Sequence, residues 1–315
     1  MRASVVVAEV VRSGLVEGRH HGSVVALDAD GGVLMERGEV RAPMFPRSCN
    51  KPLQAAAMVD HGLRLAPALL ALACASHSGE PFHVEGVRRI LADAGLTEDA
   101  LQTPPDWPLD DEARDAVVRG GGRRAPVLMN CSGKHAAMLA TCVARGWGTD
   151  DYLDVDHPLQ QAIAATFADL TGEPVAAVGV DGCGAPLLAT SLTGLARAFS
   201  RVVLADPATA AGRVAAAIQE HPRMVSGTTR DESALLTALP GAVGKAGAEG
   251  CYAVALPDGR AVALKIDDGA ARARAVVMAA TLQGLGVSSP VLVEQSRTTV
   301  RGGGRDVGEI RPVPG

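Results

Sequence analysis

Apolar residues at both ends of the chain occur in short β-branched runs or alternate with polar residues, a pattern typical of β-strands. The expected strands cover residues 5–11, 22–28, 33–35, 251–256 and 261–266. Segments 28–32 and 257–260 are polar, contain glycine and separate consecutive strands, so they predict hairpin turns. The pattern therefore indicates antiparallel strands at both ends of the chain.

Apolar residues at helical spacing, with many alanines, dominate the middle of the chain. The expected helices cover residues 53–59, 66–73, 85–94, 158–170, 191–199, 207–220 and 270–285, and a further one ends at residue 144. A short buried strand is expected at 176–180. Segment 103–126 predicts surface loop with a short helix, and the tail after Pro290 is expected to be loosely ordered.

Strands at both ends with helices between them predict an α+β fold. We expect a mixed, mainly antiparallel sheet that the N- and C-terminal strands share, with a helical middle. We find no internal repeat, and we expect one domain over residues 1–315.

Composition and charge narrow the function classes. Of the 315 residues, 47% are hydrophobic and only 3% aromatic, which predicts an aliphatic core. The net charge of −5 comes from interspersed signs, and no basic stripe with aromatic residues appears, so nucleic acid is not expected as a partner. The sequence contains no run of about eighteen apolar residues, so no membrane span is expected. The N-terminus lacks an A-x-A cleavage pattern, and six cysteines in such a chain suggest thiols or metal ligands; we expect a cytoplasmic protein.

Ser48 and Lys51 form an S-x-x-K pattern at the expected start of a helix. Residues three apart share a helix face, and unpaired backbone N–H groups there favour a developing oxyanion. A lysine amine beside the hydroxyl could take its proton, as in serine acyl-transfer enzymes. From these residues alone, an N-cap serine followed by an exposed lysine is the simpler interpretation.

Other candidate residues lie in short turns. Ser76, in Ser76-His77-Ser78, could take part in a proton relay, or the turn could simply cap the next helix. Lys245 lies between glycines before a strand, where an exposed lysine is a simpler interpretation than a catalytic one. Lys265 lies inside a strand, and alternation directs it to solvent.

Two cysteines also lie in turns. Cys131, in N-C-S-G-K-H, and Cys183, in D-G-C-G, are soft ligands suited to zinc. Without a C-x-x-C partner, however, buried free thiols explain them equally well.

These motifs occur in one order: S-x-x-K, S-H-S-G, N-C-S-G-K-H, D-G-C-G-A-P, G-K-A-G and K-I-D-D-G. In this order they resemble the rhizobial-type L-asparaginase family, also called asparaginase II, and the resemblance extends from about Ser13 to Gly269. N-C-S-G-K-H and D-G-C-G are its most specific parts. The resemblance implies a fold like that of serine β-lactamases and penicillin-binding proteins, hydrolysis of L-asparagine to L-aspartate and ammonia, and a homodimer.

Carried over residue by residue, the resemblance implies a site of several parts. Its two Ser-Lys pairs fall on Ser48 with Lys51 and on Ser76 with Lys245. Its metal ligands fall on Cys131, Lys134 and Cys183, which implies one zinc ion per chain that modulates substrate affinity. The residues that we assign to substrate binding are Arg47, Asn130, His135 and Asp181.

We therefore predict a cytoplasmic asparaginase in which Ser48 is the nucleophile and Lys51 its base. Lys265 is the alternative for the second lysine, and Thr228 could line the site. The rival functions are another acyl-transfer reaction, such as glutamine or β-lactam hydrolysis, and a non-catalytic zinc- or ligand-binding protein. Binding alone needs no nucleophile, so the two serines and two lysines favour an enzyme.

Overall fold

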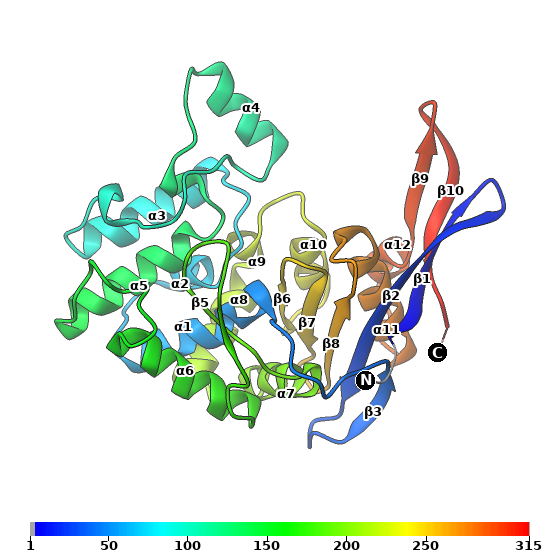
Figure 1. Cartoon of the computed structure of the whole chain (residues 1–315), viewed down its shortest axis with the longest axis horizontal. Helices are drawn as coiled ribbons and strands as arrows, with labels where there is room; N and C mark the ends of the chain where they lie inside the picture. The colour runs from blue at the N-terminus through cyan, green and yellow to red at the C-terminus, as the bar shows by residue number, and fades with distance from the viewer. Residues whose placement is uncertain (1–3, 315) are drawn as a thin grey trace.

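In the computed structural model, which describes residues 4–314, a large antiparallel sheet lies beside a lobe of helices (Figure 1). The strands are β1 (Val5–Arg12), β2 (Leu15–Leu27), β3 (Val33–Arg37), β4 (Val178–Val180), β5 (Pro186–Leu188), β6 (Val243–Ala246), β7 (Cys251–Ala255), β8 (Ala261–Ile266), β9 (Thr298–Gly302) and β10 (Arg305–Pro312).

The helices alternate with short 3-10 turns, of which η1 (Arg47–Asn50) leads into the first helix. They are α1 (Lys51–Asp60), α2 (Pro67–Ala73), α3 (Pro81–Asp93), α4 (Asp111–Arg119), α5 (Ser132–Arg145), α6 (Pro158–Thr171), α7 (Leu192–Val203), α8 (Ala210–Glu220), α9 (Pro222–Val225), α10 (Asp231–Ala238), α11 (Arg274–Gly284) and α12 (Pro290–Gln295).

The strand order of the large sheet is β6-β7-β8-β2-β1-β10-β9, and β3 pairs with β2. Every pairing among the described residues is antiparallel, and Val10 of β1 lies opposite Ile310 of β10. Strands from the two ends of the chain are thus neighbours, drawn in blue and red in Figure 1. The predicted α+β class, with a mainly antiparallel sheet shared by both ends, is confirmed. The expected domain of residues 1–315 extends past the described residues at both ends.

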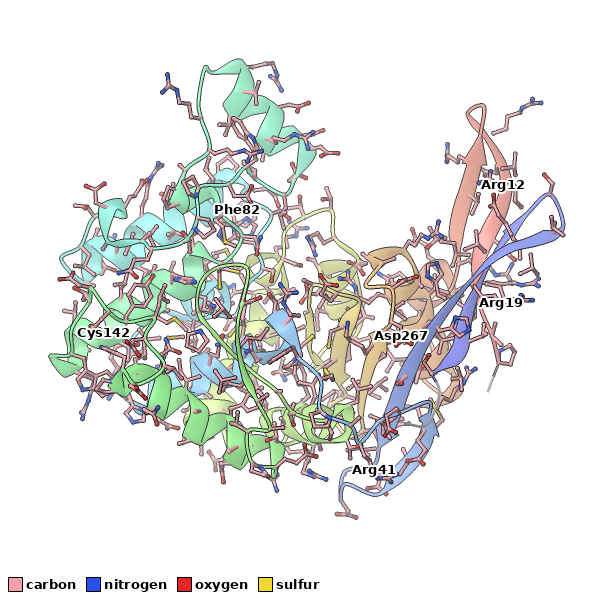
Figure 2. All side chains as sticks on the ribbon, viewed as in Figure 1. Arg12, Arg19, Arg41, Phe82, Cys142 and Asp267 are labelled. Carbon is pink, nitrogen blue, oxygen red and sulfur yellow. The ribbon has the colours of Figure 1, made fainter. Side chains whose placement is uncertain are left out.

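Strands β6, β7 and β8 form the buried part of the sheet. All of their residues are buried except Lys265 in β8, so both faces of these strands are covered. Helices α7 and α11 pack against them. Figure 2 shows Arg12 and Arg19 on the β1–β2 side of the molecule and Cys142 in the helical lobe on the other side.

Two expectations about secondary structure are wrong. The tail after Pro290 is ordered as α12, β9 and β10, because β10 completes backbone hydrogen bonding along β1. The short strand β4 exists but is not buried, because Val178 and Val180 are 51% and 80% exposed in a two-stranded hairpin with β5. No helix within residues 4–314 is long and apolar enough to cross a membrane.

Candidate active site

Ser48 lies in η1, directly before α1, and is 8% exposed. Pro52 occupies the first turn of α1, where the N–H that proline lacks has no helical partner anyway. Within residues 4–314, the Ser48 hydroxyl has no hydrogen-bond partner. The hydroxyl is therefore free to attack a bound molecule.

Arg47, the residue before Ser48, has a φ of +52°. Backbone in this left-handed region is strained for a residue with a Cβ atom, and such strain persists only where surrounding contacts impose it. Arg47 Nε donates to Asp181 Oδ1 at 2.8 Å, and Arg47 Nη1 lies 3.5 Å from Glu249 Oε1. Glu249 is itself strained, with a φ of +55°. Two anchored, strained residues therefore meet beside Ser48.

A pocket of about 360 Å³ opens beside Arg47. Both signs of charge reach it, from Arg47, Lys265 and Glu249, and apolar side chains complete its wall. Its full lining is Phe45, Arg47, Gly179, Val180, Leu187, Glu249 and Lys265. A pocket with opposite charges suits a small zwitterionic molecule.

Lys51, on the first turn of α1, is 1% exposed, and its amine lies between three polar groups. Its Nζ donates to Ala75 O at 2.5 Å and to Ser76 Oγ at 3.0 Å, and lies 3.1 Å from Cys131 Sγ. Within the described residues it makes no hydrogen bond to Ser48 Oγ. The structure thus links Lys51 to Ser76 by a hydrogen bond, whereas Ser48 is only its neighbour one helical turn earlier in the chain.

Lys245, on β6, is fully buried and lies against a carboxylate on α10. Its Nζ donates to Glu232 Oε1 at 2.8 Å, to Glu232 Oε2 at 3.0 Å and to Ala246 O at 2.7 Å. Within residues 4–314 it makes no hydrogen bond to Ser76. Burial lowers the pKa of Lys245 and Lys51 lowers it further, while Glu232 opposes both effects.

The lysines of this chain are concentrated in one region. Lysine and arginine together number 30, yet only four are lysines: Lys51, Lys134, Lys245 and Lys265. The first three are at most 2% exposed, and the fourth lines the pocket beside Arg47. Arginine cannot lose its proton in proteins, whereas a buried lysine can. Three of the four lysine amines are thus buried in the region of the candidate site.

Cys131, Lys134 and Cys183 lie together beside this region, and all are at most 3% exposed. Cys131 and Lys134 belong to the start of α5, and Cys183 belongs to the turn between β4 and β5. Lys134 Nζ lies 3.1 Å from Cys183 Sγ. Hydrogen bonding from Cys131 lowers the pKa of Cys183 and raises that of Cys131, and the nearby ammonium of Lys134 further favours the Cys183 thiolate.

The donor set of these three residues fits a zinc ion. Within residues 4–314, no group of three or more His, Cys, Asp or Glu side chains is arranged to hold a metal. A site here therefore requires the amine of Lys134 as its third donor. Ligands of a tetrahedral zinc lie roughly 3.3–3.8 Å apart for bond lengths of about 2.0–2.3 Å. The observed 3.1 Å between Lys134 Nζ and Cys183 Sγ is close to that separation.

His135 is fully buried next to the thiols, and burial lowers its pKa to about 4, so the ring is neutral. Its Nδ1 lies 2.7 Å from the hydroxyl of Tyr152, which already accepts a hydrogen bond from the N–H of Gln102. The Tyr152 proton is then available to Nδ1, which leaves the ring proton on Nε2. Within the described residues His135 Nε2 has no hydrogen-bond partner. The ring nevertheless interacts with Cys183, because His135 helps to lower the pKa of that thiol.

The family model for L-asparaginase II matches residues 8–312, nearly the whole chain. The chain belongs to the L-asparaginase II family. The family inferred from the order of the motifs is confirmed, and the protein is an amidohydrolase of the asparaginase type. No curated protein matches the sequence.

Several solved structures are similar at low identity. A β-lactamase from Mycobacterium bovis is 14% identical, with a TM-score of 0.49 over 84% of this chain and 95% of that chain. A Bacillus subtilis glutaminase, in covalent complex with 5-oxo-L-norleucine, is 11% identical, with a TM-score of 0.40 over 91% and 93%. The hydrolase EstCE1, with promiscuous acyltransferase activity, is 11% identical, with a TM-score of 0.40 over 78% and 88%. TM-scores below 0.5 identify no activity.

In this L-asparaginase II protein, the structure brings most of the predicted residues together in two connected groups. Lys51 connects them, because its amine contacts Ser76 on one side and Cys131 on the other. Asn130 belongs to the second group, since its Oδ1 accepts from Cys131 Sγ at 3.2 Å. The predicted pairing of Ser76 with Lys245 has no direct hydrogen bond among residues 4–314, and it stays a prediction.

Thr228 is hydrogen-bonded to Glu80, near the end of the loop that carries Ser76. Its N–H and its Oγ1 donate to the two carboxylate oxygens of Glu80, at 2.9 and 2.8 Å. Ser78 Oγ also donates to Ser226 O at 2.6 Å. These bonds hold segment 226–228 against the turn that carries Ser76.

Sequence reasoning missed three residues of the site: Glu232, Glu249 and Tyr152. Glu232 is 13 residues from Lys245 and lies in no recognised motif. Glu249 lies two residues after G-K-A-G, but only its φ and its contact with Arg47 distinguish it. An isolated buried tyrosine indicates packing as readily as function. Glu232 lies beside Asp231 in the first turn of α10, where acidic residues are common, so the sequence gives no signal that distinguishes it.

Proposed function

We propose that the protein hydrolyses L-asparagine to L-aspartate and ammonia, with Ser48 as the nucleophile. The observation that carries this proposal is the buried amine of Lys51, which follows the free Ser48 hydroxyl by one turn and lies 3.0 Å from Ser76 Oγ. Amide hydrolysis needs a nucleophile, a nearby base and a donor for the leaving amine. Ser48, Lys51 and Ser76 can supply these three: Lys51 bonds to Ser76 and follows Ser48 by one turn.

In the proposed mechanism, Ser48 Oγ attacks the side-chain amide carbon of asparagine while Lys51, with its amine neutral, takes the hydroxyl proton. Ser76 then donates its proton to the leaving nitrogen and receives one from Lys51, so that ammonia departs and an ester with Ser48 remains. Water attacks this ester along the reverse proton path and releases aspartate. The N–H groups at the start of α1 can stabilise the oxyanion.

Substrate recognition is assigned to the charges beside Ser48. Arg47 can bind the α-carboxylate of asparagine, and Asp181, which already pairs with Arg47, can bind the α-ammonium group. Asn130 and His135 lie on the thiol side of Lys51 and complete the polar wall.

Zinc is part of the proposal. Cys131, Lys134 and Cys183 would hold one ion per chain, and a bound zinc supplies a Lewis acid and a fixed positive charge. The chain's own residues then perform the reaction, because Ser48 and Lys51 provide the nucleophile and base. The ion would act on substrate affinity by fixing Asn130 and Asp181, which adjoin its ligands. A homodimer and a cytoplasmic location complete the proposal.

The decisive test compares ammonia release from asparagine and glutamine with ring opening of a β-lactam, followed by its absorbance, at equal concentrations. We expect asparagine to have the highest kcat/KM, since one extra methylene in a fitted pocket changes the rate by about 10–200-fold. A higher value for glutamine would make the protein a glutaminase. Absence of turnover with all three would favour a binding protein.

The same assay tests the nucleophile. Ser48→Ala should reduce kcat to background, and an acyl-enzyme trapped by acid quench should carry its added mass on the peptide that contains Ser48. Ser76→Ala should keep the acyl-enzyme but slow its formation. If Ser48→Ala keeps wild-type kcat, Ser76 takes the role of nucleophile and the proposed assignment is wrong.

A further inference from the structure

Glu232 and Lys245 form an ion pair that is completely buried from solvent. Both side chains are 0% exposed. The three protons of the Lys245 ammonium are all used, by Glu232 Oε1, Glu232 Oε2 and Ala246 O. Glu232 Oε1 also accepts from the N–H of Ala246 at 2.9 Å, so the carboxylate is fixed to β6 at two adjacent residues.

We propose that Glu232 is a positioning residue that keeps Lys245 as a fixed ammonium ion on β6, so that Lys245 acts by its charge and Lys51 alone exchanges protons with the serines. This inference rests on the proposed function and deepens it. Within residues 4–314 the Lys245 amine bonds only to Glu232 and to the backbone of Ala246, and it makes no hydrogen bond to Ser76. Ser76 already has a lysine partner in Lys51, at 3.0 Å.

Stability alone does not explain the pair. Removing two charges from water is costly, and replacing a buried ion pair with apolar residues of similar size is often neutral or stabilising. Apolar residues of the same two elements are buried, namely Leu235 and Leu236 of α10 and Val243 of β6. Arg230, Arg274 and Tyr252 also lie within electrostatic reach of the pair. A methionine and a leucine would suit this environment. The charges are therefore better explained by what they do for their neighbours.

Those neighbours belong to the candidate site. Cys49, the residue after Ser48, donates its Sγ–H to Lys245 O at 3.0 Å. Lys245 and Lys51 repel each other, and this repulsion lowers the pKa of Lys245. A cation held at Lys245 therefore provides a fixed positive charge beside η1. Glu232 determines whether that charge exists.

The charge on Lys245 depends on all groups around it. Burial, Lys51 in α1 and Arg230 before α10 lower the pKa of Lys245, and Glu232 raises it. The thiols of Cys49 in η1 and Cys74 after α2 also lie within electrostatic reach. Glu232 is thus the main anion that keeps the amine protonated. Without its carboxylate, Lys245 loses its proton at lower pH.

The test measures kcat/KM against pH for Glu232→Gln, Glu232→Asp and the wild type. If the ammonium is required, activity falls as pH rises through the pKa of Lys245. In Glu232→Gln this alkaline limb should move to lower pH by about 1–3 units, the usual effect of a charge at this distance. Glu232→Asp should restore part of the shift. Asp231→Asn is the matched control: it removes the preceding carboxylate, which pairs with Arg274 instead, and should leave the limb in place.

A second measurement does not depend on turnover. Because the chain has only four lysines, uniform labelling of lysine Cε gives four NMR signals, and Lys245→Met identifies one of them. The Lys245 signal should titrate at lower pH in Glu232→Gln than in the wild type. An unchanged titration together with an unchanged alkaline limb would overturn the inference. If the titration shifts but no amide is hydrolysed, the proposed function fails while the charge assignment stands.

The double variant Glu232→Leu/Lys245→Met covers the case in which Glu232→Gln does not fold. With both charges removed it should fold, as judged by circular dichroism, and kcat should drop at least tenfold. Adding Glu232→Gln to Lys245→Met should cause no further loss, because one residue acts through the other. Wild-type activity in the double leucine–methionine variant would assign the pair a purely structural role.

Discussion

Arg47 shows at the scale of one residue how the site holds its nucleophile. Its left-handed backbone is stabilised by two carboxylates that lie far away in the sequence, Asp181 and Glu249. The backbone turn that presents Ser48 therefore depends on side-chain contacts rather than on local propensity. Only a tertiary structure can bring these contacts together.

The strain at Arg47 is measurable by comparing Arg47→Gly with Arg47→Ala. Both remove the ion pairs, but glycine adopts a φ of +52° without penalty, so Arg47→Ala should be less stable by about 1 kcal/mol. Both should also raise KM for asparagine, because both remove the proposed carboxylate ligand. Urea denaturation and steady-state kinetics measure the two effects.

Arg41 is the matched control for this comparison. It is exposed and its φ is not positive, so there the order should reverse, with the glycine variant less stable by about 0.4–1 kcal/mol. A glycine variant that is the less stable one at Arg47 as well would show that the backbone of Arg47 is not strained.

Among single residues, the sequence predicted the members of motifs but not their partners. Ser48 and Lys51 were found because their spacing is local and their chemistry is known. Glu232 and Glu249 were not, because a buried ion pair and a left-handed φ arise from contacts across the fold. The direct partner of Lys245 was missed for the same reason: nothing in G-K-A-G indicates a carboxylate on α10.

At the scale of elements, apolar patterning predicted the helical lobe and strands β1, β3, β7 and β8 well. It failed for β9 and β10, where Arg301, Gly302, Gly303, Gly304 and Arg305 interrupt any apolar alternation. These strands form because β1 offers unpaired backbone groups along one edge, which is a tertiary cause. The apolar pattern of one segment cannot show that another strand has an unpaired edge.

Gly133, in the motif N-C-S-G-K-H, affects how two helices pack. A Cβ atom at this position would lie 2.6 Å from Leu72 O and 2.8 Å from Leu72 Cγ, so glycine allows α5 to approach α2 closely. Gly133→Ala should therefore destabilise the protein by about 1–3 kcal/mol, the usual cost of overpacking. Because Lys134 follows directly, metal content should fall as well. Thermal unfolding and elemental analysis measure both.

Gly284, the last residue of α11, is the control for Gly133. A Cβ atom there meets nothing within 4 Å, so Gly284→Ala should leave stability unchanged or raise it by up to about 1 kcal/mol. Equal destabilisation by the two variants would mean that the close approach of α5 to α2 is not what requires Gly133.

At the scale of the whole molecule, the candidate site lies where the helical lobe meets the sheet. Lys51 and Lys134 come from the lobe helices α1 and α5, whereas Lys245 comes from β6 of the sheet. Cys183 comes from a third part, the β4–β5 hairpin. A metal ion held by Cys131, Lys134 and Cys183 would thus tie the hairpin to the lobe, and its removal should affect more than its ligands.

We expect protein purified without chelator to contain roughly one zinc per chain, as for one four-coordinate site. Cys183→Ser should lower this content sharply. Chelator should lower the melting temperature of the wild type but not that of Cys183→Ser, because only a bound ion contributes stability by mass action. Metal binding requires Lys134 and the thiols to lose protons, so the zinc content after dialysis should fall as pH falls.

Cys142 is the control thiol for the zinc prediction. It lies on α5, like Lys134, but in the outer part of the helical lobe, as Figure 2 shows, and burial raises its pKa to about 11. Cys142→Ser should keep full zinc content, because the thiol lies away from Cys183. Loss of zinc in both cysteine variants would indicate general unfolding, which circular dichroism would reveal. Two results would contradict the zinc site: wild-type protein without zinc, or unchanged zinc content in Cys183→Ser. Lys134 and Cys183 would then be only a buried ion pair, because a thiolate and an ammonium 3.1 Å apart satisfy each other without a metal.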